Sequence, residues 1–152
     1  MFVLVTALAA TLSAPEDVCA VGRLALQELP AATSAGPAGH PTREYVDTDP
    51  SHTRLMQVCP ALRDSLPAGY RAADAAAWAR AQVHAPNKAA PYWPEPATVY
   101  RVEVKFDADG RSATVEVERS CTGLCGGATE SRYVRTAQGW HQEGEPRPLW
   151  VS

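Results

Sequence analysis

Cys121 and Cys125 are the residues whose types and spacing come closest to a chemical motif, in the segment Cys-Thr-Gly-Leu-Cys-Gly-Gly. Redox-active cysteine pairs are usually separated by two residues and lie at a helix N-terminus, where the helix dipole lowers the pKa of the thiol. This pair is separated by three residues and falls between two predicted strands. Gly123, Gly126 and Gly127 give the segment the backbone freedom that a tight turn requires. We therefore predict a structural disulfide, and a periplasmic thiol–disulfide redox protein using Cys121 and Cys125 is the alternative.

The remaining reactive side chains form no recognisable catalytic or metal-binding set. The four histidines stand alone in the sequence, without the His-Glu-x-x-His pattern of zinc proteases. Ser120 lies in no nucleophile elbow, and Asp107 and Asp109 belong to a predicted turn. The sequence thus predicts no catalytic residue, no metal site and no cofactor. A hydrolase or isomerase whose pocket residues are scattered along the chain stays open as a further alternative.

Composition points to one ordinary globular domain. The chain has 152 residues, of which 45% are hydrophobic and 20% charged, and its formal net charge is −3. This length is enough to bury a core. The charge is mild and no basic stripe is present, which argues against nucleic acid or an anionic membrane surface as a partner.

The first 14 residues, Met1–Ala14, are apolar and carry no charge. They are too short to span a bilayer, so we predict no stable membrane insertion, but they have the apolar core and small-residue end of a signal peptide. Residues 1–14 are therefore predicted to be a signal peptide and 15–152 a single domain of a periplasmic or secreted protein. No Lys or Arg precedes the apolar stretch, and Ser13 with Glu16 forms a capping box that favours a helix start instead. Both interpretations stay open at this point.

The four cysteines are even in number, which in an exported protein predicts two disulfides. Four cysteines allow three connectivities. We favour Cys19–Cys59 and Cys121–Cys125, a long and a short loop.

Local patterns predict the following elements in the first two thirds of the chain. Residues 15–29 are typical of a helix, with Pro15 in its first turn and two acidic residues beside it. Residues 31–50 are rich in Ala, Gly, Pro, Ser and Thr and predict a mobile loop. Residues 53–59 are interpreted as a short strand, 60–66 as a helical turn, and 72–83 as a second helix.

The last third predicts an antiparallel β-meander. Tyr100, Val102, Val104 and Phe106 alternate with polar residues, and so do Ala113, Val115 and Val117 on the next strand. Two registers are open. A four-residue loop at 107–110 pairs Val102 with Val115, whereas a two-residue Asp109-Gly110 turn sets Glu103 against Glu116.

Two further strands are expected, near 129–136 and after Gly139. An antiparallel sheet with one wet face needs a cover on its apolar face, and the two helices, 15–29 and 72–83, are the available cover. The predicted fold class is therefore α+β, with N-terminal helices packed on a C-terminal meander of about four strands.

The C-terminal third resembles uncharacterised bacterial secreted proteins. The resemblance rests on Phe106-x-Ala-Asp-Gly, the Cys121–Gly127 segment, Gly139-Trp140 and the final Trp150-Val-Ser. Such chains typically carry a Cys-Gly-x-Leu-Cys-Gly segment between two strands and finish in Trp-Val-Ser; here Thr122 replaces the Gly. The resemblance implies a secreted protein and no particular activity. The order of helices followed by a meander is also similar to the cone-shaped nuclear-transport-factor-2-like domains.

These patterns together indicate a non-catalytic binding or interaction protein. Its partner is an unidentified protein or small ligand. Tyr92 and Trp93 stand between prolines, which hold a chain extended at small entropic cost, and they are the predicted binding patch.

Overall fold

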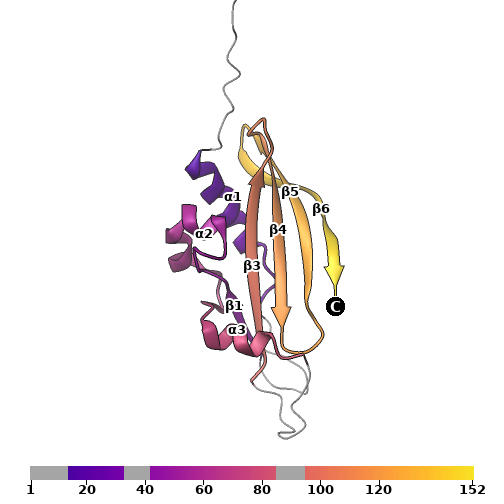
Figure 1. Ribbon diagram of the computed structural model, residues 1–152. Coiled ribbons are helices and arrows are strands. Elements are labelled where there is room, and N and C mark those ends of the chain that lie inside the picture. The colour runs from indigo at the N-terminus through magenta and orange to yellow at the C-terminus, as the bar shows by residue number, and fades with distance from the viewer. Residues whose placement is uncertain (1–13, 33–41, 85–94) are drawn as a thin grey trace, which may run out of the picture.

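The computed structural model describes residues 14–32, 42–84 and 95–152 (Figure 1). The predicted signal peptide therefore lies outside the described residues except for Ala14. Tyr92 and Trp93, the predicted binding patch, also lie outside them.

The described residues form the α-helices α1 (Pro15–Gln27), α2 (Arg54–Val58) and α3 (Ala75–Ala81) and the 3-10 helix η2 (Pro60–Ser65). The start of α1 differs from the predicted capping box, because its N-cap residue is Ala14 and no side chain caps it. The predicted strand at 53–59 is also wrong. Thr53 Oγ1 accepts a hydrogen bond from Met56 N at 3.1 Å, and such a cap stabilises a helix start.

Six strands form one open mixed sheet in the order β2-β1-β3-β4-β5-β6. Their bounds are β1 Arg43–Val46, β2 Tyr70–Ala72, β3 Ala97–Phe106, β4 Ser112–Cys121, β5 Gly127–Thr136 and β6 Gly139–Val151. The last four strands are the predicted antiparallel meander (Figure 1). β1 is parallel to both of its neighbours, β2 and β3. The crossovers that parallel pairing requires contain α2, η2 and α3.

The predicted mobile loop at 31–50 is wrong in its described second half. Residues 43–46 form β1, which lies between β2 and β3, and Tyr45, Val46 and Asp47 are all buried. The segment is too short and too polar to show a strand pattern of its own. Its order comes from the two strands that pair with it and lie far away in the sequence.

The meander has the register that the Asp109-Gly110 turn predicts, with Glu103 opposite Glu116. Each of these two glutamates has a polar partner of its own. Glu103 Oε1 accepts a hydrogen bond from Arg54 N at 3.0 Å, and Lys105 Nζ lies 3.9 Å from Glu116 Oε2. These contacts remove the objection that the charge pattern raised against this turn.

The main core lies between the sheet and the pair α1 and α2, which line one side of it in Figure 1. The predicted apolar face is confirmed: Tyr100, Val102, Val104, Ala113 and Val115 are at most 6% exposed, and Val117 is half-buried.

The second predicted helix, which is α3 in the structure, does not pack on this face. Ala77 and Ala81 of α3 pack against Tyr45, Ala97 and Val99. Val99 points away from its neighbour Tyr100, because successive side chains of a strand point to opposite faces. Helices therefore cover both faces near the start of β3, and the wet face begins only at Arg101.

Candidate functional site

A pocket of about 170 Å³ lies between the sheet and Pro30, the residue shortly after α1. Its volume is close to that of a cavity of about 150 Å³ that holds one benzene molecule. The pocket thus accommodates one ring-sized group. Its largely apolar wall is formed by Pro30, Tyr100, Val117, Arg119, Gly127, Ala128, Thr129, Trp150 and Val151.

The floor of the pocket is a row of residues that the strand register places side by side. Tyr100 of β3 pairs with Arg119, Arg119 with Gly127, and Gly127 with Val151. Gly127 has no side chain, and a Cβ there would come within 3.0 Å of the carbonyl oxygen of Trp150. Glycine at position 127 therefore lets the backbone of β6 approach β5 closely.

Pro30 is held against this row by Tyr70. The Tyr70 hydroxyl donates to the Pro30 carbonyl at 2.6 Å, and the Tyr70 and Tyr100 rings meet edge to face at 5.7 Å. Burial raises the pKa of Tyr70, and the neighbouring Tyr100 and Glu44 raise it further. Tyr70 thus stays protonated and keeps donating to Pro30.

Glu44 contributes a buried carboxyl group beside Tyr100 and Arg119. Glu44 is 8% exposed, and its Oε2 has no hydrogen-bond partner among the described residues. Burial raises the pKa of Glu44, and the Thr98 hydroxyl and the Arg119 guanidinium offset part of this effect. Arg119, which lines the pocket, therefore has beside it a carboxyl group that is costly to ionise and that is not part of the pocket wall.

Exposed apolar side chains gather beside the pocket. Within the described residues the large hydrophobic side chains that stay exposed are Leu124 (75%), Leu149 (40%), Trp150 (45%) and Val151 (78%). Ser152 N donates to the Gly126 carbonyl at 3.0 Å, which brings the loop that carries Leu124 against the end of β6. Concentrated exposed apolar surface is a mark of an interaction site.

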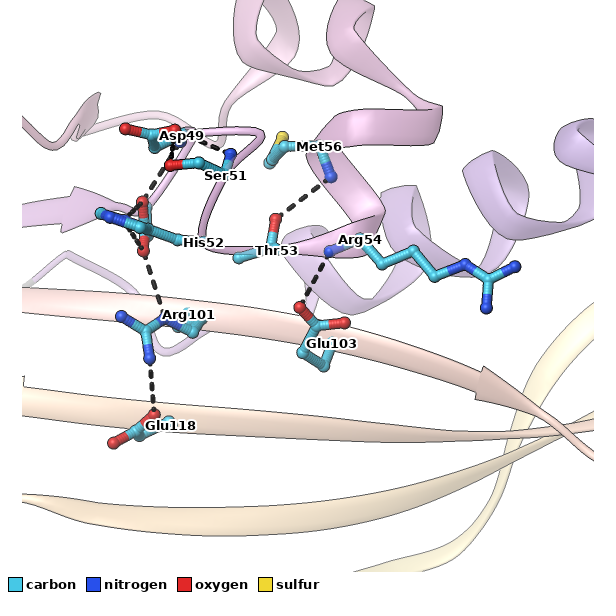
Figure 2. Close-up of polar contacts among 10 residues, drawn as sticks. Asp49, Ser51, His52, Thr53, Arg54, Met56, Arg101, Glu103 and Glu118 are labelled. Carbon is cyan, nitrogen blue, oxygen red and sulfur yellow. Dashed lines mark hydrogen bonds and ion pairs between the residues drawn. The ribbon is translucent and has the colours of Figure 1, made fainter.

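A second polar cluster surrounds Asp47, which is 1% exposed. Asp47 Oδ1 accepts from Asp49 N, and the two carboxylate oxygens lie 3.2 and 3.1 Å from His52 Nδ1. Arg101 Nε donates to Asp47 Oδ2 at 3.2 Å, and its Nη1 lies 3.4 Å from Glu118, as Figure 2 shows for the labelled members. The Arg101 guanidinium also stacks 5.1 Å above the Trp78 ring.

This cluster holds the segment after β1 onto β3. An aspartate that orients a histidine is part of many catalytic sites, but a nucleophile must also be bonded to the histidine. Among the described residues, His52 is hydrogen-bonded to Asp47, and the hydroxyl of the preceding Ser51 donates to Asp49 at 2.6 Å. Asp47 therefore acts as a structural hub that joins three parts of the chain.

Both predicted disulfides are formed, with Cα–Cα distances of 5.5 Å for Cys19–Cys59 and 5.8 Å for Cys121–Cys125. The second closes the loop between β4 and β5, not a helix N-terminus. That loop is anchored from outside, because Gly123 N donates to the Val83 carbonyl at 2.8 Å and the Thr122 hydroxyl donates to the Arg80 carbonyl at 2.9 Å. This position favours a structural disulfide.

The structure brings few of the other candidate residues together. The described histidines lie in different parts of the fold. His52 contacts Asp47, His84 Nδ1 lies 3.3 Å from the Gly123 carbonyl oxygen, and His141 lies on β6. His40 is outside the described residues. In the part of the chain that the structure describes, no three His, Cys, Asp or Glu side chains are grouped to hold a metal ion.

Sequence reasoning missed the pocket. Its residues come from four strands and the end of α1, and each is unremarkable on its own. The one local signal is Gly127, a glycine inside a strand, which often marks a close approach of another backbone. Trp150, which lines the pocket, is 45% exposed.

Comparisons with models of protein families, with curated proteins and with solved structures found no match. Within the described residues no helix has the length and apolar character needed to cross a bilayer. The site must therefore be interpreted from its own geometry.

Proposed function

We propose that this chain is an exported, non-catalytic binding domain that holds one apolar, ring-sized group of a partner in the pocket beside Tyr100, Thr129 and Trp150. The observation that carries the proposal is that Trp150 and Val151 line the pocket and are also exposed apolar residues. A pocket that is surrounded by exposed apolar surface matches the centre of a binding site, where a few anchors supply most of the affinity.

Export is supported by the two disulfides, because such bonds persist in oxidising compartments and are rare in the cytosol of mesophiles. The apolar residues 1–14 and the resemblance of the last third to bacterial secreted proteins agree with it. Export to the periplasm or the medium stays a prediction, as does the similarity to cone-shaped domains. The pocket in any case lies near the β6 edge of an open sheet.

Indole is a suitable probe, because its size matches the pocket. Titration followed by amide chemical shifts should give saturable changes at Tyr100, Gly127 and Val151, with a dissociation constant in the millimolar range that a fragment of this size reaches. The variant Thr129→Phe fills the pocket from an exposed wall position. It should weaken indole binding at least about tenfold, a loss of about 1.4 kcal/mol.

The matched control is Thr114→Phe. It makes the same change in β4, on the face of the sheet opposite to the pocket, and should leave the affinity for indole unchanged. The proposal is wrong if indole gives no saturable shifts at the pocket, or if both variants bind it as the unchanged chain does. Thermal unfolding of both variants checks that each is folded.

A further inference from the structure

We infer that Leu124 of one copy of this chain inserts into the pocket of a second copy, which returns the same contact, so that the two form a symmetric dimer. This inference rests on the proposed function and names the partner that fills the pocket. The apolar group held there is then the leucine side chain of an identical molecule.

Leu124 stands on a loop that the fold holds in place. Its side chain is 75% exposed, and the disulfide between Cys121 and Cys125 closes the loop around it. Hydrogen bonds from Thr122 and Gly123 join the loop to carbonyl groups of α3 and of the residues that follow it. Little conformational freedom is left for such a loop to lose on binding, which favours Leu124 as the anchor of an interface.

The loop and the pocket are neighbours. The connection between β4 and β5 lies at the same end of the sheet as the end of β6 (Figure 1). Leu124 precedes Gly127, a residue of the pocket wall, by three positions, so their Cα atoms are at most about 11 Å apart. A Cβ at Gly126 would lie 3.6 Å from the ring of Trp150, which also lines the pocket.

Leu124 does not fill the pocket of its own chain, because a side chain in a pocket is buried and this one is exposed. The disulfide and the hydrogen bonds of the loop hold it outward. A leucine that enters this pocket from such a loop must therefore belong to another molecule.

The pocket suits a leucine in size and in chemistry. Its volume of about 170 Å³ is close to that of an engineered cavity of about 150 Å³, made by removing one leucine side chain. Arg119, the one charged residue of the wall, already lies beside the Tyr100 hydroxyl and the Glu44 carboxyl. The wall therefore requires no hydrogen bond from its occupant, which favours an aliphatic side chain.

A projecting side chain and a pocket on the same surface close into a dimer when a two-fold axis passes between them. Each copy then gives one leucine and receives one, and because both pockets are occupied the assembly stops at two. Trp150 and Val151, which line the pocket and are exposed, are covered by the same contact. A contact centred on two leucines is small, so we expect a dissociation constant in the micromolar range.

Sedimentation velocity of the chain with both disulfides intact, over micromolar to millimolar concentrations, measures this association. Leu124→Ser removes the exposed anchor and should weaken the dimer about a hundredfold, about tenfold for each of its two contacts. Leu124→Met is the matched control, because it keeps an apolar side chain of similar size and should retain the dimer. Thr129→Phe fills the pocket and should weaken the dimer as Leu124→Ser does.

A mixture of the two weakened variants gives the most specific test. Leu124→Ser keeps its pocket and Thr129→Phe keeps its leucine, so a mixed pair retains one of the two contacts. At a concentration where each variant alone is monomeric, the mixture should contain a dimer about tenfold weaker than that of the unchanged chain. A substitution that only disturbed folding would not be repaired by mixing.

Four outcomes overturn the inference. They are an unchanged chain that stays monomeric at millimolar concentration, equal association of Leu124→Ser and Leu124→Met, a mixture without a mixed dimer, and an assembly that grows beyond two copies.

Indole added to the Leu124→Ser variant, whose pocket stays free, tests the proposed function separately. If that variant binds indole and the unchanged chain is monomeric, the dimer is wrong and the proposed function stands. If the dimer forms as expected and indole does not bind, the pocket accepts an aliphatic side chain and the proposal of a ring-sized group is wrong. If neither indole binding nor the dimer is observed, both are wrong.

Discussion

Removing the two disulfides one at a time should destabilise the protein by clearly different amounts. The first variant carries Cys19→Ala with Cys59→Ala, and the second carries Cys121→Ala with Cys125→Ala. The bonds join residues 40 and 4 positions apart. In the chain-entropy model a cross-link stabilises by restricting the unfolded chain, which gives about 4 kcal/mol for the long loop and about 2 kcal/mol for the short one.

The loss of buried contacts should be similar in the two variants and should not alter this difference in stability. One cysteine of each pair, Cys59 or Cys121, is 3% exposed, so each variant leaves a similar small gap in the buried interior. The free energy of unfolding should thus fall by about 2 kcal/mol more in the Cys19 and Cys59 variant than in the other.

Equilibrium unfolding in urea, followed by far-ultraviolet circular dichroism, measures both losses. The slope of the transition should also rise more for the long loop, because a longer unfolded segment becomes accessible to solvent. A loss in the Cys121 and Cys125 variant equal to or larger than that of the long loop would refute the entropic reasoning. It would show that the anchored β4–β5 loop holds the end of the sheet together through native contacts.

Three further predictions concern buried groups. Val115→Asp, at a fully buried position, should cost about 3 kcal/mol or more because it buries an unpaired charge, whereas Thr114→Asp on the opposite face should cost little; urea midpoints compare them. Glu44→Gln should stabilise the protein at neutral pH and not at low pH. The pKa of Glu44 is raised on folding, so its favourable contribution to stability is complete below the unfolded pKa of 4.5 and is lost as pH rises through the folded pKa. A difference in unfolding free energy between Glu44→Gln and the unchanged chain that does not vary with pH would contradict the burial argument. Asp47→Ala should cost about 2 kcal/mol and increase hydrogen exchange between Thr48 and Thr53, since it removes the acceptor of Asp49, His52 and Arg101; unchanged exchange there would show that Asp47 is not the hub of this segment.

Local signals were sufficient for the meander and the first helix. The alternation from Tyr100 to Val117 assigned the buried face. The register was open between two pairings, and the structure has the one that the Asp109-Gly110 turn predicts. Pro15, Glu16 and Asp17 located the start of α1, with only the capping residue wrong. Each of these features depends on residues a few positions apart, whose effects a sequence displays directly.

The disulfide pairing was favoured from the sequence but not fixed by it, because four cysteines allow three connectivities. The structure forms the favoured pairs, Cys19–Cys59 and Cys121–Cys125. The sequence by itself therefore determined the α+β class and the apolar face, and left the covalent links open.

Only the tertiary structure decided where β1 and the pocket lie. Residues 43–46 become a strand because β2 and β3 pair with them, and Asp47 is buried because Arg101, 54 positions later, pairs with its charge. The pocket is lined by residues of four strands and by Pro30, which only the folded chain brings together. Such features depend on which distant segments become neighbours, and that is set by the packing of the whole chain rather than by any local pattern.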